Sequence, residues 1–473
     1  MPPPRNARPK LAVVGAGWAG CAAALEAAAQ GCDVTLFEAS RQLGGRARAL
    51  ITQRPDGQPL TLDNGQHILI GAYRDTLALM QRAGVQPAQA LLSLPLALPY
   101  PDGSGLQTPH WAARWPAPFN ALAAIACARG WRWVERLALI RASLGWQWAG
   151  FACAPHLTVG QLCASLPRRV QDELIEPLCV SALNLPAAQA SAQVFLNVMR
   201  DALFGQGFAD WAASSLLLPR TDLSQLLPQA VAEQLQTRYA SHSHLRLSSR
   251  VLGLQTQASG WQLHGTGWRE TFDGIIWATA AAPAAQAMRQ AAEQAAEQAG
   301  QPANPPPAHA SALLHWANST DALHHTAITT VYAWAPGVRL PAPMLALRCG
   351  PPASGQHPAQ FVFDRGHIHP HDPAASGVLA FVISASEGER TSLETAVLQQ
   401  AADQLGLYTL QAVQTVTEKR ATFACTPGLQ RPSAAIAPGL WAAGDYLASP
   451  YPATLETAVR SGLAAVRGVL AGG

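Results

Sequence analysis

Three glycines near the start of the chain have the spacing of a phosphate-binding loop. Gly15, Gly17 and Gly20 separate a short apolar strand from an Ala-rich helical segment. In such a loop the first glycine allows a tight turn, the second lets a pyrophosphate approach the backbone, and the third allows close packing of helix on strand. A second strand ends at Glu38, whose carboxylate can accept hydrogen bonds from a ribose. The predicted dinucleotide-binding residues of this β-α-β unit are Gly15, Ala16, Gly17, Trp18, Ala19, Gly20 and Glu38.

Two further blocks favour FAD over NAD as the dinucleotide. Gly44, Gly45 and Arg46 follow the unit, and glycine backbone with one arginine can meet the pyrophosphate and ribityl chain of an extended FAD. Gly444 and Asp445 end a late strand before a helix start, where a carboxylate can hold the ribityl hydroxyls and the helix N-terminus stabilises a reduced flavin. Each block also has a plain structural interpretation: the Gly-Gly-Arg block can be a surface turn, and Asp445 can be a helix cap. The residues predicted here to bind FAD are Gly44, Gly45, Arg46, Gly444, Asp445, Ala453 and Thr454.

The first β-α-β unit and the last strand-helix unit are far apart in the sequence but carry the same kind of motif. We therefore expect an α/β fold with one nucleotide-binding domain assembled from separate segments, and a second domain of helices over a β-sheet. The predicted segments are 1–81, 216–280 and 411–473 for the nucleotide-binding domain and 82–215 and 281–410 for the second, substrate-binding domain.

The composition excludes several classes of protein. Of the 473 residues, 49% are apolar and 13% are charged, which favours burial over disorder. The 32 basic and 29 acidic residues give a net charge of +3, too balanced for an electrostatic nucleic-acid interface. The eight cysteines form no Cys-x-x-Cys pair and most lie among apolar residues, so we expect free thiols in a reducing cytoplasm.

Three alternating histidines are a weak candidate for a metal site. His367, His369 and His371 can face one side of a strand and bind a metal there. Gly366 and Pro370 beside them predict a surface loop instead, so we expect no metal.

Tryptophans and arginines cluster in residues 111–148. Such a mixture with Leu and Ala suits a helix lying in a membrane interface, and equally an ordinary amphipathic helix with core tryptophans. Peripheral contact with the inner face of the cytoplasmic membrane therefore stands as one of two alternatives. The uncharged stretch 142–167 contains Pro155 and several polar residues and does not qualify as a membrane span. The cluster consists of Trp111, Arg114, Trp115, Arg129, Trp131, Arg132, Trp133, Arg136, Arg141, Trp146 and Trp148.

Taken together, the motifs resemble a known family. The glycine loop, the Gly-Gly-Arg block and the terminal Gly-Asp are similar to those of the FAD-dependent amine oxidase and phytoene desaturase superfamily, which implies a Rossmann-like FAD domain of the amine oxidase (GR2) type. Three longer blocks resemble the squalene-associated FAD-dependent desaturases, understood as hydroxysqualene dehydroxylases of hopanoid biosynthesis. These blocks are LDNGQHILIGAYRDTLALM (62–80), EPLCVSALNLPAAQASAQVF (176–195) and LWAAGDYLASPYPATLETAVRSG (440–462).

The resemblance implies a reduction of an apolar C30 isoprenoid. Loss of an allylic hydroxyl would leave a delocalised cation, and reduced flavin would deliver hydride to give squalene; the electron donor stays open. Gln66 and His67 would lie near the flavin, where His67 can donate a proton to the leaving hydroxyl, or both can hold the backbone of a tight turn. Val251 resembles the position whose backbone meets adenine.

Two other functions remain open at this point. The same FAD motifs serve an oxidative flavoprotein acting on a polyene or an amine, because a fold does not fix a function. Tyr446 and Tyr451 lie near the terminal Gly-Asp and suit the aromatic flavin surroundings of an amine oxidase. A non-enzymatic isoprenoid-binding protein of the same fold is a third, less favoured hypothesis, because it would not need the full set of FAD motifs.

Overall fold

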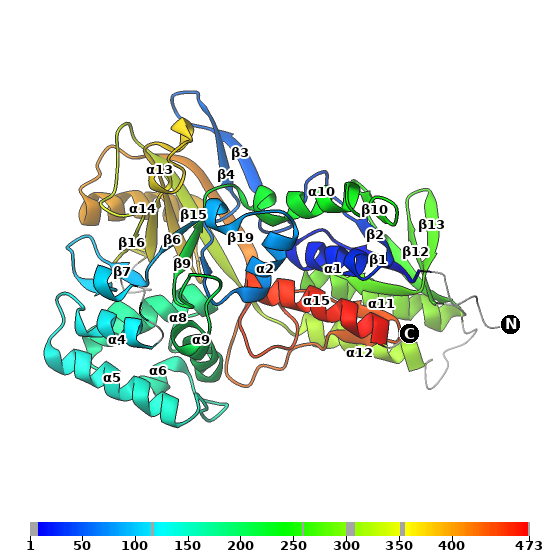
Figure 1. The fold of residues 1–473 in the computed structure, drawn as a ribbon, viewed down its shortest axis with the longest axis horizontal. Coiled ribbons are helices and arrows are strands. Elements are labelled where there is room, and N and C mark those ends of the chain that lie inside the picture. The colour runs from blue at the N-terminus through cyan, green and yellow to red at the C-terminus, as the bar shows by residue number, and fades with distance from the viewer. Residues whose placement is uncertain are drawn as a thin grey trace.

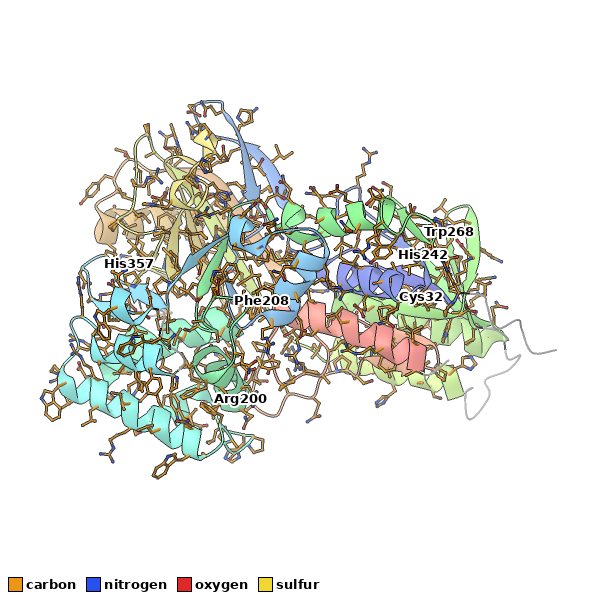
Figure 2. The ribbon with its side chains drawn as sticks, viewed as in Figure 1. Cys32, Arg200, Phe208, His242, Trp268 and His357 are labelled. Atoms are coloured by element: carbon orange, nitrogen blue, oxygen red, sulfur yellow. The ribbon has the colours of Figure 1, made fainter. Side chains whose placement is uncertain are left out.

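The computed structural model describes residues 8–113, 115, 118–257, 260–298, 308–350 and 355–471, so Arg114 of the cluster above lies outside the described residues. These residues form two lobes (Figure 1). The parallel-sheet lobe contains both ends of the described chain, and the antiparallel-sheet lobe contains most of its middle. In Figure 2, Cys32 and Trp268 mark the first lobe, and Arg200 and His357 mark the second.

The parallel-sheet lobe is built on six strands. Across the sheet these are β10 (Ser243–Arg246), β2 (Asp33–Phe37), β1 (Lys10–Val14), β14 (Gly274–Trp277), β21 (Leu440–Ala442) and β20 (Ala435–Ala437). The central strand β1 pairs in parallel with β2 and β14, and β20 alone pairs antiparallel. Helix α1 (Trp18–Ala29) connects β1 to β2, which confirms the predicted β-α-β unit. The parallel sheet with its covering helices confirms the predicted Rossmann-like α/β class.

Two helices approach each other closely beside this sheet. Helix α15 (Leu455–Ala471), at the C-terminal end, packs along α1 (Figure 1). An ideal Cβ placed on Gly462 of α15 would lie 2.2 Å from the carbonyl oxygen of Ala19 in α1. Because only glycine avoids this clash, the backbones can approach closely enough for the N-termini of both helices to reach one cavity.

The antiparallel-sheet lobe contains five strands and several helices. Across its sheet the strands are β16 (Met344–Ala346), β17 (Phe361–Asp364), β18 (Val378–Ser384), β15 (His325–Trp334) and β19 (Gln411–Phe423). The helical elements of this part of the chain are η1 (His110–Ala112), α4 (Phe119–Ala126), α5 (Trp133–Trp148), α6 (Val159–Leu162), α7 (Arg168–Val170), the π-helical η2 (Gln171–Ile175), α8 (Glu176–Leu183), α9 (Ala192–Phe204), α13 (Arg365–Ile368), η5 (Pro373–Ala375) and α14 (Arg390–Leu405).

Alternating side chains give this sheet two different buried faces. Val362 and Phe381 belong to a core cluster with Val397 of α14, so that helix covers one face. Phe363 and Val382, one residue further along their strands, belong to the main core cluster on the other face. Successive side chains of a strand point to opposite faces, so the second face is free to line a cavity.

Smaller elements surround the two main sheets. The remaining strands are β3 (Ala49–Gln53), β4 (Pro59–Asp63), β5 (Leu69–Ile70), β6 (Leu91–Leu94), β7 (Ala97–Pro99), β8 (Gly105–Gln107), β9 (Leu216–Pro219), β11 (Gly253–Gln257), β12 (Gly260–Gly265) and β13 (Trp268–Phe272). The remaining helices are α2 (Arg74–Arg82), α3 (Pro87–Ala90), the π-helical η3 (Gln225–Gln229), α10 (Ala230–Gln236), α11 (Ala281–Gln298) and α12 (Ala308–Asp321). Strands β11, β12 and β13 form an antiparallel sheet of their own beside the parallel one.

The path of the chain differs from the predicted segments at three places. Helices α11 and α12, predicted in the second domain, pack on each other and on β11 and β20 of the parallel-sheet lobe. Strand β19, predicted in the nucleotide-binding domain, pairs with β15 over most of its length. Strand β9 pairs with β6, although a predicted boundary separates them. In each case long-range burial and strand pairing decide the position, and neither is visible in the local pattern.

The stretch 142–167 is divided between two helices. It begins in α5, turns after Trp148 and ends beyond the short helix α6. Within the described ranges, we find no helix with the length and apolar character needed to cross a membrane.

The close contact of α1 and α15 predicts a strong effect of one methyl group. Gly462→Ala should lower the free energy of unfolding by about 1–3 kcal/mol, because the added Cβ forces the helices apart. Gly145→Ala is the matched control: it lies in helix α5, where a Cβ meets no atom within 4 Å, and alanine there should be neutral or slightly stabilising. Denaturant unfolding followed by circular dichroism measures both; equal stability of the two variants would contradict the packing described.

Candidate active site

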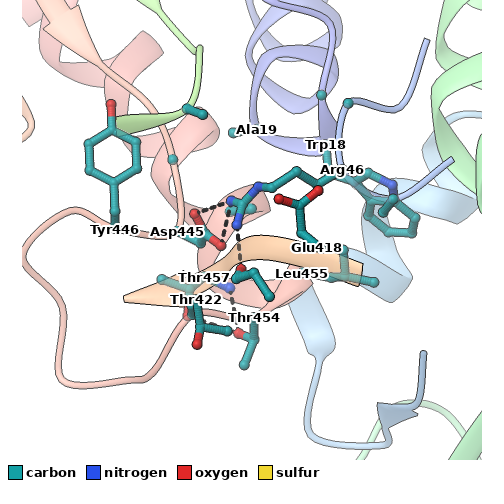
Figure 3. A pocket seen from close by; sticks show the side chains of 18 of the residues that line it. Trp18, Ala19, Arg46, Glu418, Thr422, Asp445, Tyr446, Thr454, Leu455 and Thr457 are labelled. Atoms are coloured by element: carbon teal, nitrogen blue, oxygen red, sulfur yellow. Dashed lines mark hydrogen bonds and ion pairs between the residues drawn. The ribbon is translucent and has the colours of Figure 1, made fainter. Parts of the chain in front are cut away.

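A cavity of about 930 Å³ lies where segments of both lobes meet. Figure 3 shows part of its wall, with Arg46, Asp445, Thr454 and Thr457 close together. Of the residues predicted from the sequence, Ala16 and Gly20 do not reach the cavity surface. Those that line it are Gly15, Gly17, Trp18, Ala19, Glu38, Gly44, Gly45, Arg46, Gln66, His67, Val251, Gly444, Asp445, Ala453 and Thr454.

The three glycines of the first loop have three different surroundings. Gly15 has a φ of +104°, a conformation that side chains disfavour, and a Cβ there would lie 2.8 Å from the carbonyl oxygen of Ala278. A Cβ on Gly20 would lie 1.8 Å from the carbonyl oxygen of Gly15, so this glycine serves close packing. A Cβ on Gly17 would meet nothing within 4 Å. Gly17 therefore borders open space at the start of α1.

Glu38 is held by backbone on both of its carboxylate oxygens. The N–H of Ala16 donates to Oε2 and the N–H of Ser40 donates to Oε1, each at 2.8 Å. The carbonyl oxygen of Glu38 accepts from Ser249 N–H at 2.8 Å. This bond brings the segment that contains Val251 to the same end of the cavity as Glu38.

The second glycine block lies against the first. The N–H of Gly44 donates to the carbonyl oxygen of Ala16 at 2.9 Å, and the two loops form an isolated bridge between Gly17 and Gly44. A Cβ on Gly45 would come within 3.2 Å of Gly17 Cα. The two glycine loops thus form one continuous surface of exposed backbone.

Arg46 and Asp445 form an ion pair in the cavity wall (Figure 3). Arg46 Nη2 lies 2.6 Å from Oδ1 and 2.8 Å from Oδ2 of Asp445. The Asp445 carboxylate raises the pKa of Arg46 further above its ordinary value. Nη1 donates to the carbonyl oxygen of Ala421 in β19. The two charged residues predicted to bind FAD therefore contact each other directly.

Helix α15 begins at the cavity with a side-chain cap. Thr454 Oγ1 accepts from the N–H of Thr457 at 3.1 Å, while the N–H of Gly444 donates to Ser461 Oγ at 2.8 Å. Residues at the N-termini of both α1 and α15 line the cavity. Two helix dipoles therefore make this end of the cavity favourable for negative charge.

Gln66 and His67 lie in the wall and bond to backbone. His67 Nδ1 lies 2.8 Å from the carbonyl oxygen of Gly65, and Gln66 Nε2 donates to the carbonyl oxygen of His67 at 3.3 Å. Burial lowers the pKa of His67 from its ordinary value of 6.5, so the ring is neutral at pH 7. Nδ1 then carries the proton that it donates to Gly65, and Nε2 is an acceptor. This state disfavours the predicted use of His67 as a proton donor.

Several residues of the cavity were not predicted from the sequence. Asn184 lines it in the left-handed conformation, with φ +52°, and its side chain bonds to Thr326 and Thr422 of the antiparallel sheet. Tyr451, noted as a neighbour of the terminal Gly-Asp, donates from its hydroxyl to the Asp201 carboxylate. The apolar residues of the wall that were not predicted include Ile68, Ala182, Val198, Ile328, Phe361, Phe363 and Val382. Of these residues, Ala182 and Asn184 lie in the block 176–195, Ile68 lies in the block 62–80 and Tyr451 lies in the block 440–462, but the resemblance named none of them as site residues.

The three alternating histidines have other partners. His367 Nε2 lies 2.9 Å from the carbonyl oxygen of Leu340, and His369 Nδ1 lies 3.2 Å from that of Arg220. His371 is exposed. Within the described part of the chain, no group of three or more His, Cys, Asp or Glu residues could hold a metal ion.

Comparison with known proteins identifies the family. The profile of the flavin-containing amine oxidoreductases matches residues 18–470. The chain belongs to this family. Its fold is similar to that of cyclohexylamine oxidase from Brevibacterium oxydans, with a TM-score of 0.60 at 16% identity over 98% of both chains. Membership confirms the predicted cofactor, FAD, and makes the protein a flavin-dependent oxidoreductase.

Curated relatives match shorter stretches. A carotenoid phi-ring synthase from Streptomyces griseus is 35% identical over 118 residues, 25% of this chain and 22% of that protein. A hydroxysqualene dehydroxylase from Sinorhizobium fredii is 25% identical over 260 residues, 52% of this chain and 54% of that protein. The matches thus span about a fifth and about half of the relatives' own lengths.

The residues present fit an extended dinucleotide. The glycine loops and two helix N-termini suit a pyrophosphate, and the Arg46–Asp445 pair offers donors and acceptors beside them. Three polar atoms of residues that line the cavity are buried without a hydrogen-bond partner among the described residues: Trp18 Nε1, Gln66 Oε1 and the Tyr446 hydroxyl. Buried polar atoms normally have partners, so these three mark places where a bound polar group can complete the wall.

The open space at Gly17 predicts a variant that folds but binds its cofactor poorly. Gly17→Ala adds a methyl group that meets no protein atom yet occupies the approach of a pyrophosphate to the helix start. We expect an unchanged melting temperature and at least about a tenfold rise in the Kd for FAD. Flavin fluorescence titration measures the affinity, with Gly145→Ala as control; unaltered FAD affinity would remove Gly17 from the phosphate site.

A buried carboxyl group beside the site predicts a pH dependence of stability. Burial raises the pKa of Asp63 from 3.8 to about 7. The hydrogen bond from Leu223 N–H lowers this pKa, but its effect is smaller than that of burial. The folded state therefore holds this proton more tightly than the unfolded state, and the stability it contributes is lost as pH rises from about 4 to about 7.

Asp63→Asn should remove this dependence. The difference in free energy of unfolding between pH 5 and pH 8 should be larger in the wild-type protein than in the variant, by up to roughly 3 kcal/mol. Urea unfolding at both pH values measures it, with the exposed Asp210→Asn as control. Parallel stability profiles of wild type and Asp63→Asn would show that Asp63 titrates normally.

Proposed function

We propose that this oxidoreductase removes the allylic hydroxyl group of hydroxysqualene by reduction and forms squalene. The observation that carries the proposal is the apolar wall that β15, β17 and β18 contribute to the cavity of the FAD residues. The match to a hydroxysqualene dehydroxylase over 52% of this chain supports it.

The apolar wall suits both the substrate and its reactive state. Ile328, Phe361, Phe363 and Val382 offer a C30 hydrocarbon the burial that apolar ligands need. A wall of this kind also excludes water, which would otherwise capture an allylic cation. Phe361 and Phe363 can in addition stabilise positive charge through their ring faces.

The polar residues of the wall position the hydroxyl group. His67 is neutral and keeps Nε2 as an acceptor, because Nδ1 is bound to Gly65. It can therefore accept a hydrogen bond from the substrate hydroxyl and orient it. Gln66 Oε1, buried without a described partner, offers a second acceptor. The reaction breaks the allylic C–O bond, takes up one proton and releases the oxygen as water.

Reduced FAD, held by the glycine loops and the two helix N-termini, would supply hydride to the carbon that has lost the hydroxyl group. The protein stabilises negative charge near the bound flavin. Both helix N-termini favour the negative charge of a reduced flavin, and the Arg46–Asp445 pair fixes the region between them. The external electron donor is outside this proposal.

Oxidation of a polyene is the second candidate function. It is favoured by the stretch that is 35% identical to the carotenoid phi-ring synthase, and the same apolar wall would serve it. Oxidation of an amine has a smaller basis: Tyr446 and Tyr451 line the cavity, but Tyr446 packs edge-on against Trp316, with ring centroids 6.4 Å apart. Both alternatives require electrons to flow from substrate to flavin, opposite to the proposal.

The direction of electron flow separates these functions. The purified protein is reduced anaerobically, hydroxysqualene is added, and flavin absorbance near ~450 nm is followed while the extracted lipid is analysed. We expect reoxidation of the flavin with one squalene formed per flavin. Gly17→Ala, depleted of FAD, should form none. A flavin that stays reduced while the lipid is unchanged would overturn the proposal and favour the oxidative candidates.

A further inference from the structure

Large apolar side chains are exposed together on one part of the antiparallel-sheet lobe. Eight of the thirteen exposed large apolar side chains in the described residues lie between 111 and 148. Single exposed apolar residues are ordinary, whereas a cluster marks an interaction surface. We call this surface the tryptophan face; its members, with their exposed fractions, are Trp111 (62%), Trp115 (44%), Phe119 (56%), Trp133 (72%), Val134 (41%), Leu137 (46%), Leu144 (45%) and Trp148 (91%).

Five exposed residues of helix α5 lie along one side of the helix. Trp133, Leu137, Arg141, Leu144 and Trp148 are exposed and follow at intervals of four, four, three and four residues. At 100° per residue these positions fall within an arc of about 80°. The helix therefore presents one continuous stripe to solvent, with a tryptophan at each end. Figure 1 places α5 along the outer edge of its lobe.

This stripe is unlike the outer side of an ordinary surface helix. The inner side of α5 buries Leu139 against the main core cluster. A surface helix normally pairs such a buried apolar side with a polar outer side. Here the outer side is apolar as well, so the alternative of an ordinary amphipathic helix with core tryptophans does not describe Trp133 and Trp148.

The charges around the stripe are positive. Between residues 118 and 167 the chain has four arginines and one acidic residue, Glu135. Glu135 is 3% exposed and is paired with Arg132. Arg129, Arg132 and Arg141 are exposed, and Arg141 has no hydrogen-bond or ion-pair partner among the described residues. The surface thus combines exposed tryptophans with a surplus of positive charge.

We propose that the tryptophan face docks on the surface of an anionic phospholipid bilayer. Tryptophans take positions at the level of the lipid headgroups, apolar side chains enter the acyl boundary, and arginines attract acidic headgroups. Leu137 and Leu144 lie between Trp133 and Trp148 on the stripe, so α5 would lie in the plane of the interface. A protein partner would need an apolar surface for the stripe together with acidic residues for the arginines. An anionic bilayer provides both, through its acyl chains and its acidic headgroups.

The docking face belongs to the lobe that supplies the apolar cavity wall. Helix α5 contacts α7, which continues through η2 into α8. Ser181 and Ala182 of α8 line the cavity. A bilayer held at α5 would bring dissolved apolar substrates to this lobe. The docking itself does not depend on the proposed reaction, and its test requires no turnover.

Vesicle flotation tests the proposal on the full FAD-loaded protein. Vesicles of phosphatidylcholine with phosphatidylglycerol are compared with vesicles of phosphatidylcholine alone. We expect flotation with the anionic vesicles and a decrease at high salt, because screening weakens the attraction of arginine to acidic lipid. The double variant Trp133→Gln/Trp148→Gln should lower the partition coefficient at least about tenfold, and Arg141→Glu at least about fivefold.

Matched variants control for general effects of surface change. Ile51→Gln/Tyr408→Gln removes two side chains that are 82% and 81% exposed but lie outside the tryptophan face, and Arg390→Glu reverses an exposed charge on α14. Both should float like the wild type. Equal flotation of the tryptophan variant and the wild type, or no flotation at all, would overturn the proposal. A dimer in light scattering that the tryptophan variant abolishes would also overturn it and assign the face to a second copy.

Discussion

The Arg46–Asp445 ion pair joins parts of the chain that are 399 residues apart. Arg46 follows the second glycine block, Asp445 follows the last strand of the parallel sheet, and the same guanidinium donates to the carbonyl oxygen of Ala421 in the antiparallel sheet. One side chain therefore connects both lobes at the cavity. The Asp445 carboxylate, whose side chain is 13% exposed, needs such a partner because withdrawing an unpaired charge from water is costly.

One end of the cavity is lined by backbone and polar groups, and the other end is lined by apolar side chains. Helix N-termini, glycine backbone and Glu38 line the first, and strands of the antiparallel sheet line the second. Because strand side chains alternate, Phe363 can face the cavity while Val362 packs beneath α14. A single sheet thus serves as both the core of a lobe and the wall of a substrate site. Because the chain belongs to a flavin-containing family and the residues predicted to bind FAD line this cavity, the cavity is the candidate site of redox chemistry.

The sequence was most informative where function requires a special backbone. Gly15 and Gly20 were identifiable because only glycine tolerates their positions, and the strand-helix-strand context made the motif specific. The apolar wall was not identifiable, since Phe361 and Val382 look like any buried strand residues until pairing sets their face. Domain limits failed for the same reason: β19 and α11 find their partners far along the chain. The neutral state of His67 depends on burial, which local pattern does not report.

The interleaved order of the parallel sheet has a consequence for biosynthesis. Its neighbours β1, β14 and β21 come from the beginning, the middle and the end of the chain. The ribosome must therefore synthesise the chain through residue 471 before β21 can pair in the sheet and α15 can pack on α1, and such long-range pairing is slow. Until then, the apolar edge of β14 and the inner side of α1 lack their covering partners. The segment from β21 to α15 thus decides when the nascent chain can first retain its flavin, and a product that lacks this segment would expose these surfaces to aggregation.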